Sequence, residues 1–264
     1  NHYISFMKQQ LTELLSNYGK IDGIWFDGYW DQINDERDKK VATHINWHMD
    51  EIYALIHRLQ PACMIGNNHH RTPLPGEDFQ MFEKDLPGGN STGFGGQDIS
   101  ALPLETCETM NNSWGFNITD TKYKSVKQLI RYLAGAAGRN ANFLLNIGPM
   151  PNGKIQPEFT DTLKAIGKWM DKYGASIYGT RGGPMAAQPW GVMTSNANTC
   201  YLHVFDSPSL PYLFIPAFKQ KIKAIHQMST GKSVRFKQQP EGVFVYWEGV
   251  SPDDIDTILE VKSE

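Results

Sequence analysis

The sequence has few of the features that mark several protein classes. Its 264 residues include three cysteines, Cys63, Cys107 and Cys200, which are far apart and odd in number. They form neither a metal-ligand spacing nor a disulfide framework, and they indicate little about the redox compartment. No Lys- or Arg-rich run occurs and the formal net charge is -3, so the charge pattern favours neither nucleic acid nor a membrane as a partner. No apolar run reaches the length of a membrane-spanning helix.

The hydrophobic pattern changes near residue 177. Before that point, apolar residues at helical spacing predict helices that alternate with short apolar strands. The helices are expected over 1–18, 42–59, 125–138 and 157–173, and the strands over 23–28, 63–67, 104–110 and 141–148. After about Tyr178 the apolar runs are short and are separated by Pro, Gly, Ser and Asp, which is typical of strands and turns. We therefore expect an α/β domain over 1–177 and an all-β domain over 178–264.

A long segment, residues 71–103, interrupts the first domain. It includes Pro73, Pro75 and Pro87 and, between residues 88 and 96, five glycines, and its sequence predicts irregular structure throughout. A loop of this length inside a compact domain is usually functional or mobile.

Strand–helix alternation implies a parallel sheet with right-handed connections. The four strands expected here are half of the eight that a (β/α)8 barrel requires. The pattern alone leaves two alternatives, a small open sheet or a barrel whose first half is missing. The strand over 23–28 is apolar on both faces, which predicts neighbours on both sides of it.

An acid stands at the end of that strand. The apolar run 24–26 leads directly to Asp27, and residues just past the carboxyl end of a parallel strand line the active site in such domains. Nearby Trp25, Tyr29 and Trp30 offer flat apolar faces that suit a sugar. In glycoside hydrolysis one carboxylate attacks or stabilises the anomeric carbon and a second protonates the leaving oxygen. The alternative is that Asp27 caps the following segment or pairs with a nearby base.

The second carboxylate is expected from a later strand end or loop. The candidates are Glu77, Asp78, Glu83, Glu105 and Glu108. Their spacing alone does not choose among them.

Four motifs together resemble glycoside hydrolase family 29, the α-L-fucosidases. They are "YGKIDGIWFDG", "EDFQMFEKDLPG", "ETCETMNNSWGFN" and "NFLLNIGPMPNGKI", which occur in the order and approximate spacing of that family over nearly the whole chain. The resemblance implies a (β/α)8-like (TIM-type) barrel followed by an antiparallel β-sandwich. It also implies a retaining exo-hydrolase that releases α-L-fucose from glycans or oligosaccharides and needs no cofactor and no metal.

The resemblance assigns roles to two carboxylates. Trp25-Phe26-Asp27 matches the W-x-D motif that carries the nucleophile. "EDFQMFE" loosely matches the segment with the acid/base, which places that role on Glu83, with Glu77 as the alternative. Glu105 aligns with a glutamate that we interpret as structural.

Three further residues are expected to contact the sugar: Trp25, His69 and Trp114. His69 and its neighbour His70 follow a strand and are able to hydrogen-bond sugar hydroxyls, while no third residue at a suitable spacing supports a metal site. Trp25 or Trp114 would cover the methyl group of a 6-deoxy sugar.

The resemblance also implies a missing part. The family's pocket uses His, Tyr and Trp residues from earlier strands, including a K-H-H-D-G-like motif that this sequence lacks. We therefore expect residues 1–177 to be the C-terminal part of the barrel and the functional protein to be longer on its N-terminal side. The family implies a secreted, periplasmic or lysosomal location, although no signal peptide is visible in this chain. The alternative function is a non-catalytic glycan-binding protein that kept the sandwich and half of the pocket.

Overall fold

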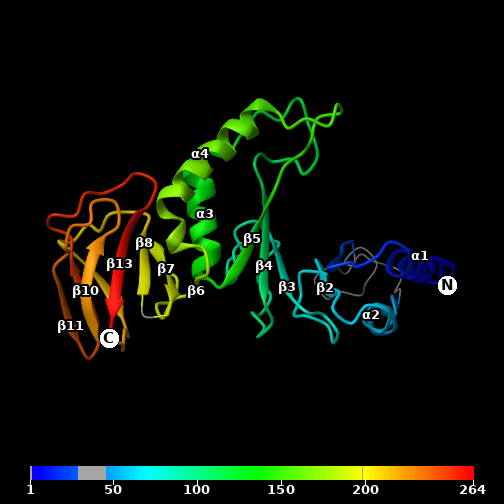
Figure 1. Cartoon of the computed structure of the whole chain (residues 1–264), viewed down its shortest axis with the longest axis horizontal. Coiled ribbons are helices and arrows are strands. Elements are labelled where there is room, and N and C mark those ends of the chain that lie inside the picture. The colour runs from blue at the N-terminus through cyan, green and yellow to red at the C-terminus, as the bar shows by residue number, and fades with distance from the viewer. Residues whose placement is uncertain (1, 29–45, 198) are drawn as a thin grey trace. The chain divides into compact units, whose positions relative to one another are not determined.

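A computed structural model describes residues 2–28, 46–197 and 199–264 (Figure 1). The chain divides into two compact units, Asn1–Cys107 and Glu108–Glu264. The predicted division at residues 177–178 stays a prediction. Tyr29, Trp30 and the start of the helix expected over 42–59 lie outside the described residues.

Two helices and two paired strands begin the first unit. Helix α1 (His2–Asn17) agrees with the predicted first helix, and α2 (Met49–Leu59) covers the end of the predicted second one. Their apolar stripes pack together with β2 in one core that includes Leu11, Ile52 and Ile65. Residues 46–48 are not helical, and His48 has a left-handed backbone with φ of 51°.

Strand β1 (Gly23–Phe26) pairs in parallel with β2 (Met64–Asn67), with Trp25 opposite Gly66. Within the described residues no second strand pairs with β1. The Trp25 side chain is 43% exposed. The neighbours expected on both sides of this strand are thus present on one side only in the described part of the chain.

The prediction that residues 71–103 are irregular throughout is wrong. Residues Gln80–Glu83 form strand β3, which pairs in parallel with β4 (Leu104–Thr109), so that Glu83 lies opposite Cys107. The first three residues of β3 are buried. A fully buried run of this length shows no alternation of polar and apolar residues, which is why the sequence pattern did not reveal it.

The second unit begins with the expected helical elements. Helix α3 (Val126–Gly138) is followed by β5 (Ala141–Asn146), α4 (Pro157–Tyr173) and a short 3-10 turn, η2 (Gly174–Ser176). A capping box begins α3: the Ser125 side chain accepts from the Gln128 backbone N–H, and the Gln128 side chain accepts from the Ser125 backbone N–H. Pro157 occupies the first turn of α4, where its missing N–H has no helical partner to lose.

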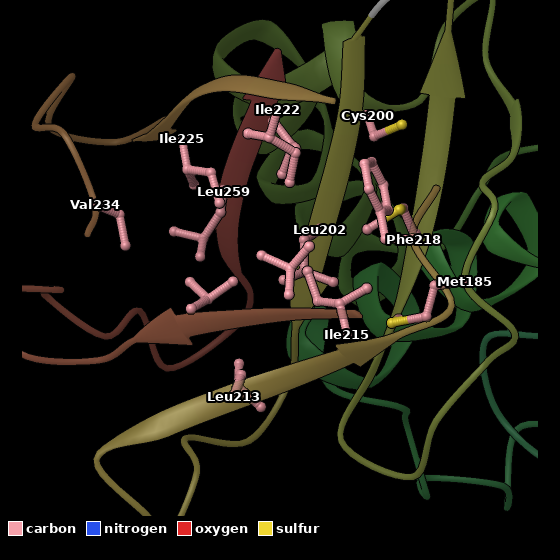
Figure 2. Packing of buried hydrophobic residues seen from close by; sticks show 14 of the residues in the cluster. Met185, Cys200, Leu202, Leu213, Ile215, Phe218, Ile222, Ile225, Val234 and Leu259 are labelled. Carbon is pink, nitrogen blue, oxygen red and sulfur yellow. The ribbon is translucent and has the colours of Figure 1, made fainter. Parts of the chain in front are cut away.

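The rest of the second unit is antiparallel β-structure, as expected after residue 178. One sheet has the order β10-β13-β8-β7-β6 and the other the order β11-β12-β9. The strands are β6 (Arg181–Gly182), β7 (Gly191–Asn196), β8 (Thr199–Val204), β9 (Tyr212–Pro216), β10 (Ile222–Gln227), β11 (Phe236–Gln239), β12 (Gly242–Tyr246) and β13 (Thr257–Ser263). Buried side chains of both sheets, among them Leu202 and Ile215, form one core (Figure 2). This arrangement is a β-sandwich.

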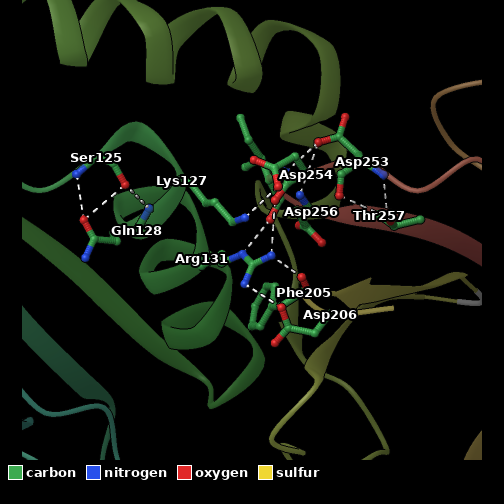
Figure 3. A network of polar contacts seen from close by, with 11 residues as sticks. Ser125, Lys127, Gln128, Arg131, Phe205, Asp206, Asp253, Asp254, Asp256 and Thr257 are labelled. Atoms are coloured by element: carbon green, nitrogen blue, oxygen red, sulfur yellow. Dashed lines mark hydrogen bonds and ion pairs between the residues drawn. The ribbon is translucent and has the colours of Figure 1, made fainter. Parts of the chain in front are cut away.

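Helix α3 is attached to this sandwich by polar contacts and by close packing. The Arg131 guanidinium donates to Asp206 Oδ1 at 3.0 Å, to the Ile255 carbonyl at 2.8 Å and to the Phe205 carbonyl (Figure 3). At the end of the helix, a Cβ on Gly138 would lie 2.5 Å from Val192 Cβ of β7. The compact unit therefore contains both the helices and the sandwich.

The described residues show neither a disulfide bond among the cysteines nor a membrane-spanning helix. The three cysteines, all in described segments, are buried and form no disulfide with one another. No described helix combines the length and the apolar character needed to cross a bilayer.

Candidate active site

Polar side chains follow the ends of three strands in the first unit. Asp27 comes directly after β1, Asn68 comes directly after β2, and Glu83 is the last residue of β3. The parallel register pairs Phe26 with Asn67, and the Asn68 backbone N–H donates to the Phe26 carbonyl at 2.9 Å. The carboxyl ends of parallel strands meet at one edge of a sheet, and ligands bind there in α/β proteins.

One amide group connects the two carboxylates. The Asn68 side-chain nitrogen donates to Asp27 Oδ1 at 3.2 Å and to Glu83 Oε2 at 2.9 Å. Asn68 is 3% exposed, so its position is fixed by packing. Two oxygens that share one nitrogen at these distances are close enough to flank a single glycosidic bond, for which a retaining enzyme needs carboxyl groups about 5 to 5.5 Å apart.

His70 lies on the Glu83 side of this pair. Its Nε2 is 3.6 Å from Glu83 Oε2, its Nδ1–H donates to the Phe94 carbonyl at 3.0 Å, and its ring stacks on the Phe94 ring. Burial lowers the pKa of His70, and the nearby Glu83 carboxylate opposes that shift. The neutral ring is therefore favoured, with its proton on Nδ1.

His69, by contrast, is 2% exposed and belongs to a buried network. Its Nε2–H donates to Glu77 Oε1 at 2.9 Å, and its Nδ1 accepts from the Arg71 backbone N–H at 3.1 Å. Glu77 also accepts from the Tyr53 hydroxyl at 2.9 Å, and that hydroxyl in turn accepts from the Asn67 amide. Both ring nitrogens of His69 thus have protein partners within this buried network.

Two of the remaining acidic candidates, Asp78 and Glu108, have structural partners. Asp78 Oδ2 contacts His57 Nε2 at 2.9 Å and accepts from the Ile65 backbone N–H at 2.8 Å. Burial raises the pKa of Glu105. In the second unit, Glu108 forms an ion pair with Lys124 at 3.2 Å.

The two tryptophans expected at the sugar are partly exposed. Trp25 lies in β1, two residues before Asp27, and its side chain is 43% exposed. Trp114 belongs to the second unit, where its carbonyl accepts from the Asn146 amide at 2.8 Å.

Sequence reasoning did not single out Asn68, Phe94 or Asp85; it interpreted both His69 and His70 as able to hydrogen-bond sugar hydroxyls and chose His69 as the candidate. A signal for Asn68 was present, because "GNNHH" is a polar run that begins at the end of a buried strand. Which of its members turns to the carboxylates depends on the register with β1, which the sequence does not reveal. Among the described residues, no group of three or more His, Cys, Asp and Glu side chains is arranged to hold a metal ion.

Comparisons with known proteins agree with the resemblance in the motifs. A family model for alpha-L-fucosidase matches residues 1–175. An alpha-L-fucosidase of Branchiostoma floridae is 36% identical over 213 residues, which cover 76% of this chain and 42% of that protein. The human tissue alpha-L-fucosidase is 29% identical over 230 residues, which cover 81% of this chain and 42% of that protein.

A solved structure covers the whole chain. Alpha-L-fucosidase isoenzyme 1 from Paenibacillus thiaminolyticus superimposes with a TM-score of 0.77 and 31% identity, covering 100% of this chain and 63% of that one. The chain spans less than half the length of the curated relatives described here, at 42% of each. It belongs to the alpha-L-fucosidase family.

Proposed function

We propose that the protein containing this chain is a retaining exo-glycosidase that releases α-L-fucose from fucosylated glycans or oligosaccharides. The observation that carries the proposal is the shared Asn68 amide, which holds the Asp27 and Glu83 carboxylates together at adjacent strand ends. Family membership supplies the substrate class, and the paired carboxylates supply the reaction type.

In the first step, Asp27 attacks the anomeric carbon while protonated Glu83 gives its proton to the leaving oxygen. The glycosidic bond breaks and a fucosyl ester forms on Asp27. In the second step, Glu83 removes a proton from water as that water attacks the anomeric carbon. The ester bond breaks, the configuration is restored, and Glu83 is protonated again for the next cycle. Asn68, with two amide protons, is able to hold both carboxylates in place.

Glu83 is preferred over Glu77 as the acid/base because of their surroundings. Glu77 is 6% exposed, and its oxygens are engaged by Tyr53 and His69. Glu83 is only partly buried and shares its amide donor with Asp27. A group that exchanges protons with substrate and water needs contact with both, and only Glu83 combines such access with proximity to Asp27.

We also propose that β1 to β5 are C-terminal strands of a (β/α)8-like barrel and that further strands precede them in the full-length protein. The unpaired side of β1 within the described residues supports this proposal, because a strand edge with an exposed tryptophan is normally covered. So does the 42% share of the relatives' length that the chain spans. A secreted, periplasmic or lysosomal location and the sugar-contacting roles of Trp25 and Trp114 stay predictions.

The test is the activity of the full-length protein on a 4-nitrophenyl α-L-fucoside, with the anomer of the first product identified by NMR. Retention should give α-L-fucose first. Asp27→Asn should lower turnover by about 10⁴-fold or more without loss of folding, as expected when a nucleophile is removed. Asp22→Asn, an exposed acid at the opposite end of the same strand, is the matched control and should keep full activity. Fucose binding without any hydrolysis by the wild-type protein would instead favour the glycan-binding alternative.

A further inference from the structure

We propose that Phe94 forms an aromatic platform for the leaving group, and that this platform accepts the apolar C–H face of the sugar to which fucose is attached. This inference rests on the proposed function, because it assigns Glu83 to the leaving-group side of the bond. It goes further in naming a second sugar subsite and the residue that forms it.

The position of Phe94 follows from a chain of contacts that begins at the nucleophile. Asp27 and Glu83 share the Asn68 amide, Glu83 Oε2 is 3.6 Å from His70 Nε2, and the His70 ring stacks on Phe94 with centroids 5.3 Å apart. Phe94 is therefore connected to Asp27 by a series of contacts that includes Glu83. The acid protonates the oxygen of the leaving group, so a surface beyond Glu83 is next to the leaving group.

The Phe94 ring is fixed and yet accessible. The interplanar angle with His70 is 28°, which is a stacked arrangement, and 41% of Phe94 remains exposed. A large aromatic side chain gains most from burial, so an exposed ring stacked on the histidine that contacts the proposed acid indicates a ligand surface. The apolar C–H face of a sugar ring is similar in size to a phenyl ring, and the sugar's hydroxyl groups lie at the rim of that face. Without a ligand, the apolar face of the Phe94 ring is left in contact with water.

The loop that carries Phe94 is organised in advance by Asp85, which is buried two residues after Glu83. Asp85 Oδ1 accepts from the Ser91 backbone N–H at 2.7 Å, and Oδ2 accepts from the Thr92 and Gly95 backbone N–H groups at 3.1 and 3.2 Å. The Ser91 and Thr92 hydroxyls donate to the same carboxylate.

The loop also closes tightly on itself. A Cβ at position 95 would lie 2.0 Å from the Gly89 carbonyl oxygen, so only glycine fits there. Together with the bond from His70 to the Phe94 carbonyl, these contacts fix the backbone of Phe94 before any ligand arrives. Preorganisation of this kind lowers the entropic cost of binding, which is what a specificity subsite requires.

The experiment measures kcat/KM of the full-length wild-type protein and of Phe94→Ala on three substrates. α-L-Fucosyl fluoride has no leaving-group ring. 4-Nitrophenyl α-L-fucoside has a flat ring but an activated leaving group that needs little protonation. A fucosyl disaccharide has a sugar ring and needs the acid. Phe6→Ala, which removes another exposed phenylalanine of the same unit, is the matched control.

We expect Phe94→Ala to lower kcat/KM about 3- to 10-fold on the disaccharide and on the aryl fucoside, since aromatic contacts contribute about 0.5 to 1.5 kcal/mol. The value on the fluoride should stay within about 2-fold of wild type, and Phe6→Ala should match wild type on all three. An equal loss on all three substrates would mean that Phe94 supports the whole pocket, and a loss on the disaccharide alone would mean that it acts through Glu83. Either result overturns the inference, as does no loss on any substrate.

The same measurements separate this inference from the proposed function. If wild type hydrolyses fucosyl fluoride and Phe94→Ala behaves as wild type throughout, the enzyme assignment stands and the platform is wrong. If wild type hydrolyses none of the three substrates, the proposed function fails and the platform fails with it.

Discussion

The Asn68 amide nitrogen lies 2.9 Å from Glu83 Oε2, although the two residues stand at the ends of different strands and are 15 positions apart. The same nitrogen reaches Asp27 at 3.2 Å. A buried amide is thus the physical link between the two carboxylates to which we assign the chemistry, and it gives the most direct test of their arrangement.

Asn68→Ala should lower kcat/KM about 10- to 100-fold on all fucosides. We expect the lost positioning to cost about as much as one hydrogen bond to a charged group, about 1.5 to 3 kcal/mol, because the carboxylates themselves remain. Steady-state kinetics of the full-length protein checks this. Asn152→Ala, a change in an exposed turn, should have no effect. Unchanged kinetics in Asn68→Ala would contradict the proposed role of the amide.

Glu83→Gln should affect substrates according to their leaving groups. General acid catalysis contributes about 10²- to 10⁴-fold, so kcat/KM on a fucosyl disaccharide should fall by that range. The value on 4-nitrophenyl α-L-fucoside should fall far less, because 4-nitrophenolate departs without a proton. Glu77→Gln provides the comparison: if its loss depends on the leaving group and that of Glu83→Gln does not, the acid is Glu77.

The loop held by Asp85 should loosen in acid. Burial alone would raise the pKa of Asp85, but hydrogen bonds from Ser91 and Thr92 outweigh it and lower the pKa below the ordinary 3.8. A lowered pKa means that the ionised form stabilises the fold above the ordinary value and that this contribution is lost as pH falls through the lowered one.

Hydrogen exchange measures this loss. Protection of the Ser91, Thr92 and Gly95 amides, corrected for intrinsic rates, should be high at pH 5 and should fall below about pH 3.8. Asp85→Asn should show weakened protection at both pH values. Protection that is independent of both pH and Asp85 would refute the assignment.

Gly138→Ala should destabilise the protein, although alanine favours helices. A Cβ at this position would lie 2.5 Å from Val192 Cβ, and overpacking of this kind costs about 1 to 3 kcal/mol. Gly167 of α4 is the matched control, because a Cβ there meets nothing within 4 Å. Gly167→Ala should stabilise by up to about 1 kcal/mol. Thermal unfolding of both variants tests this prediction, which fails if both substitutions shift Tm in the same direction.

Much of the local structure was determined by the sequence alone. Helical spacing located α3 and α4, and the change to short apolar runs located the sandwich strands. These signals are local: each depends on residues within a few positions of one another. The acid at the end of β1 was visible for the same reason, since a strand end is recognised from a short run of sequence.

Only the tertiary structure decided the composition of the site. Strand β3 was missed because four residues, mostly buried, produce no periodic signal. His69 and His70 are neighbours with the same chemistry, yet one is buried against Glu77 and the other lies beside Glu83. His70 has a left-handed backbone, with φ of 56°. Asn68 reaches both carboxylates because the β1–β2 register and the end of β3 bring three distant segments to one edge. Register and backbone reversal depend on contacts between residues far apart in the chain, and a local pattern does not contain them.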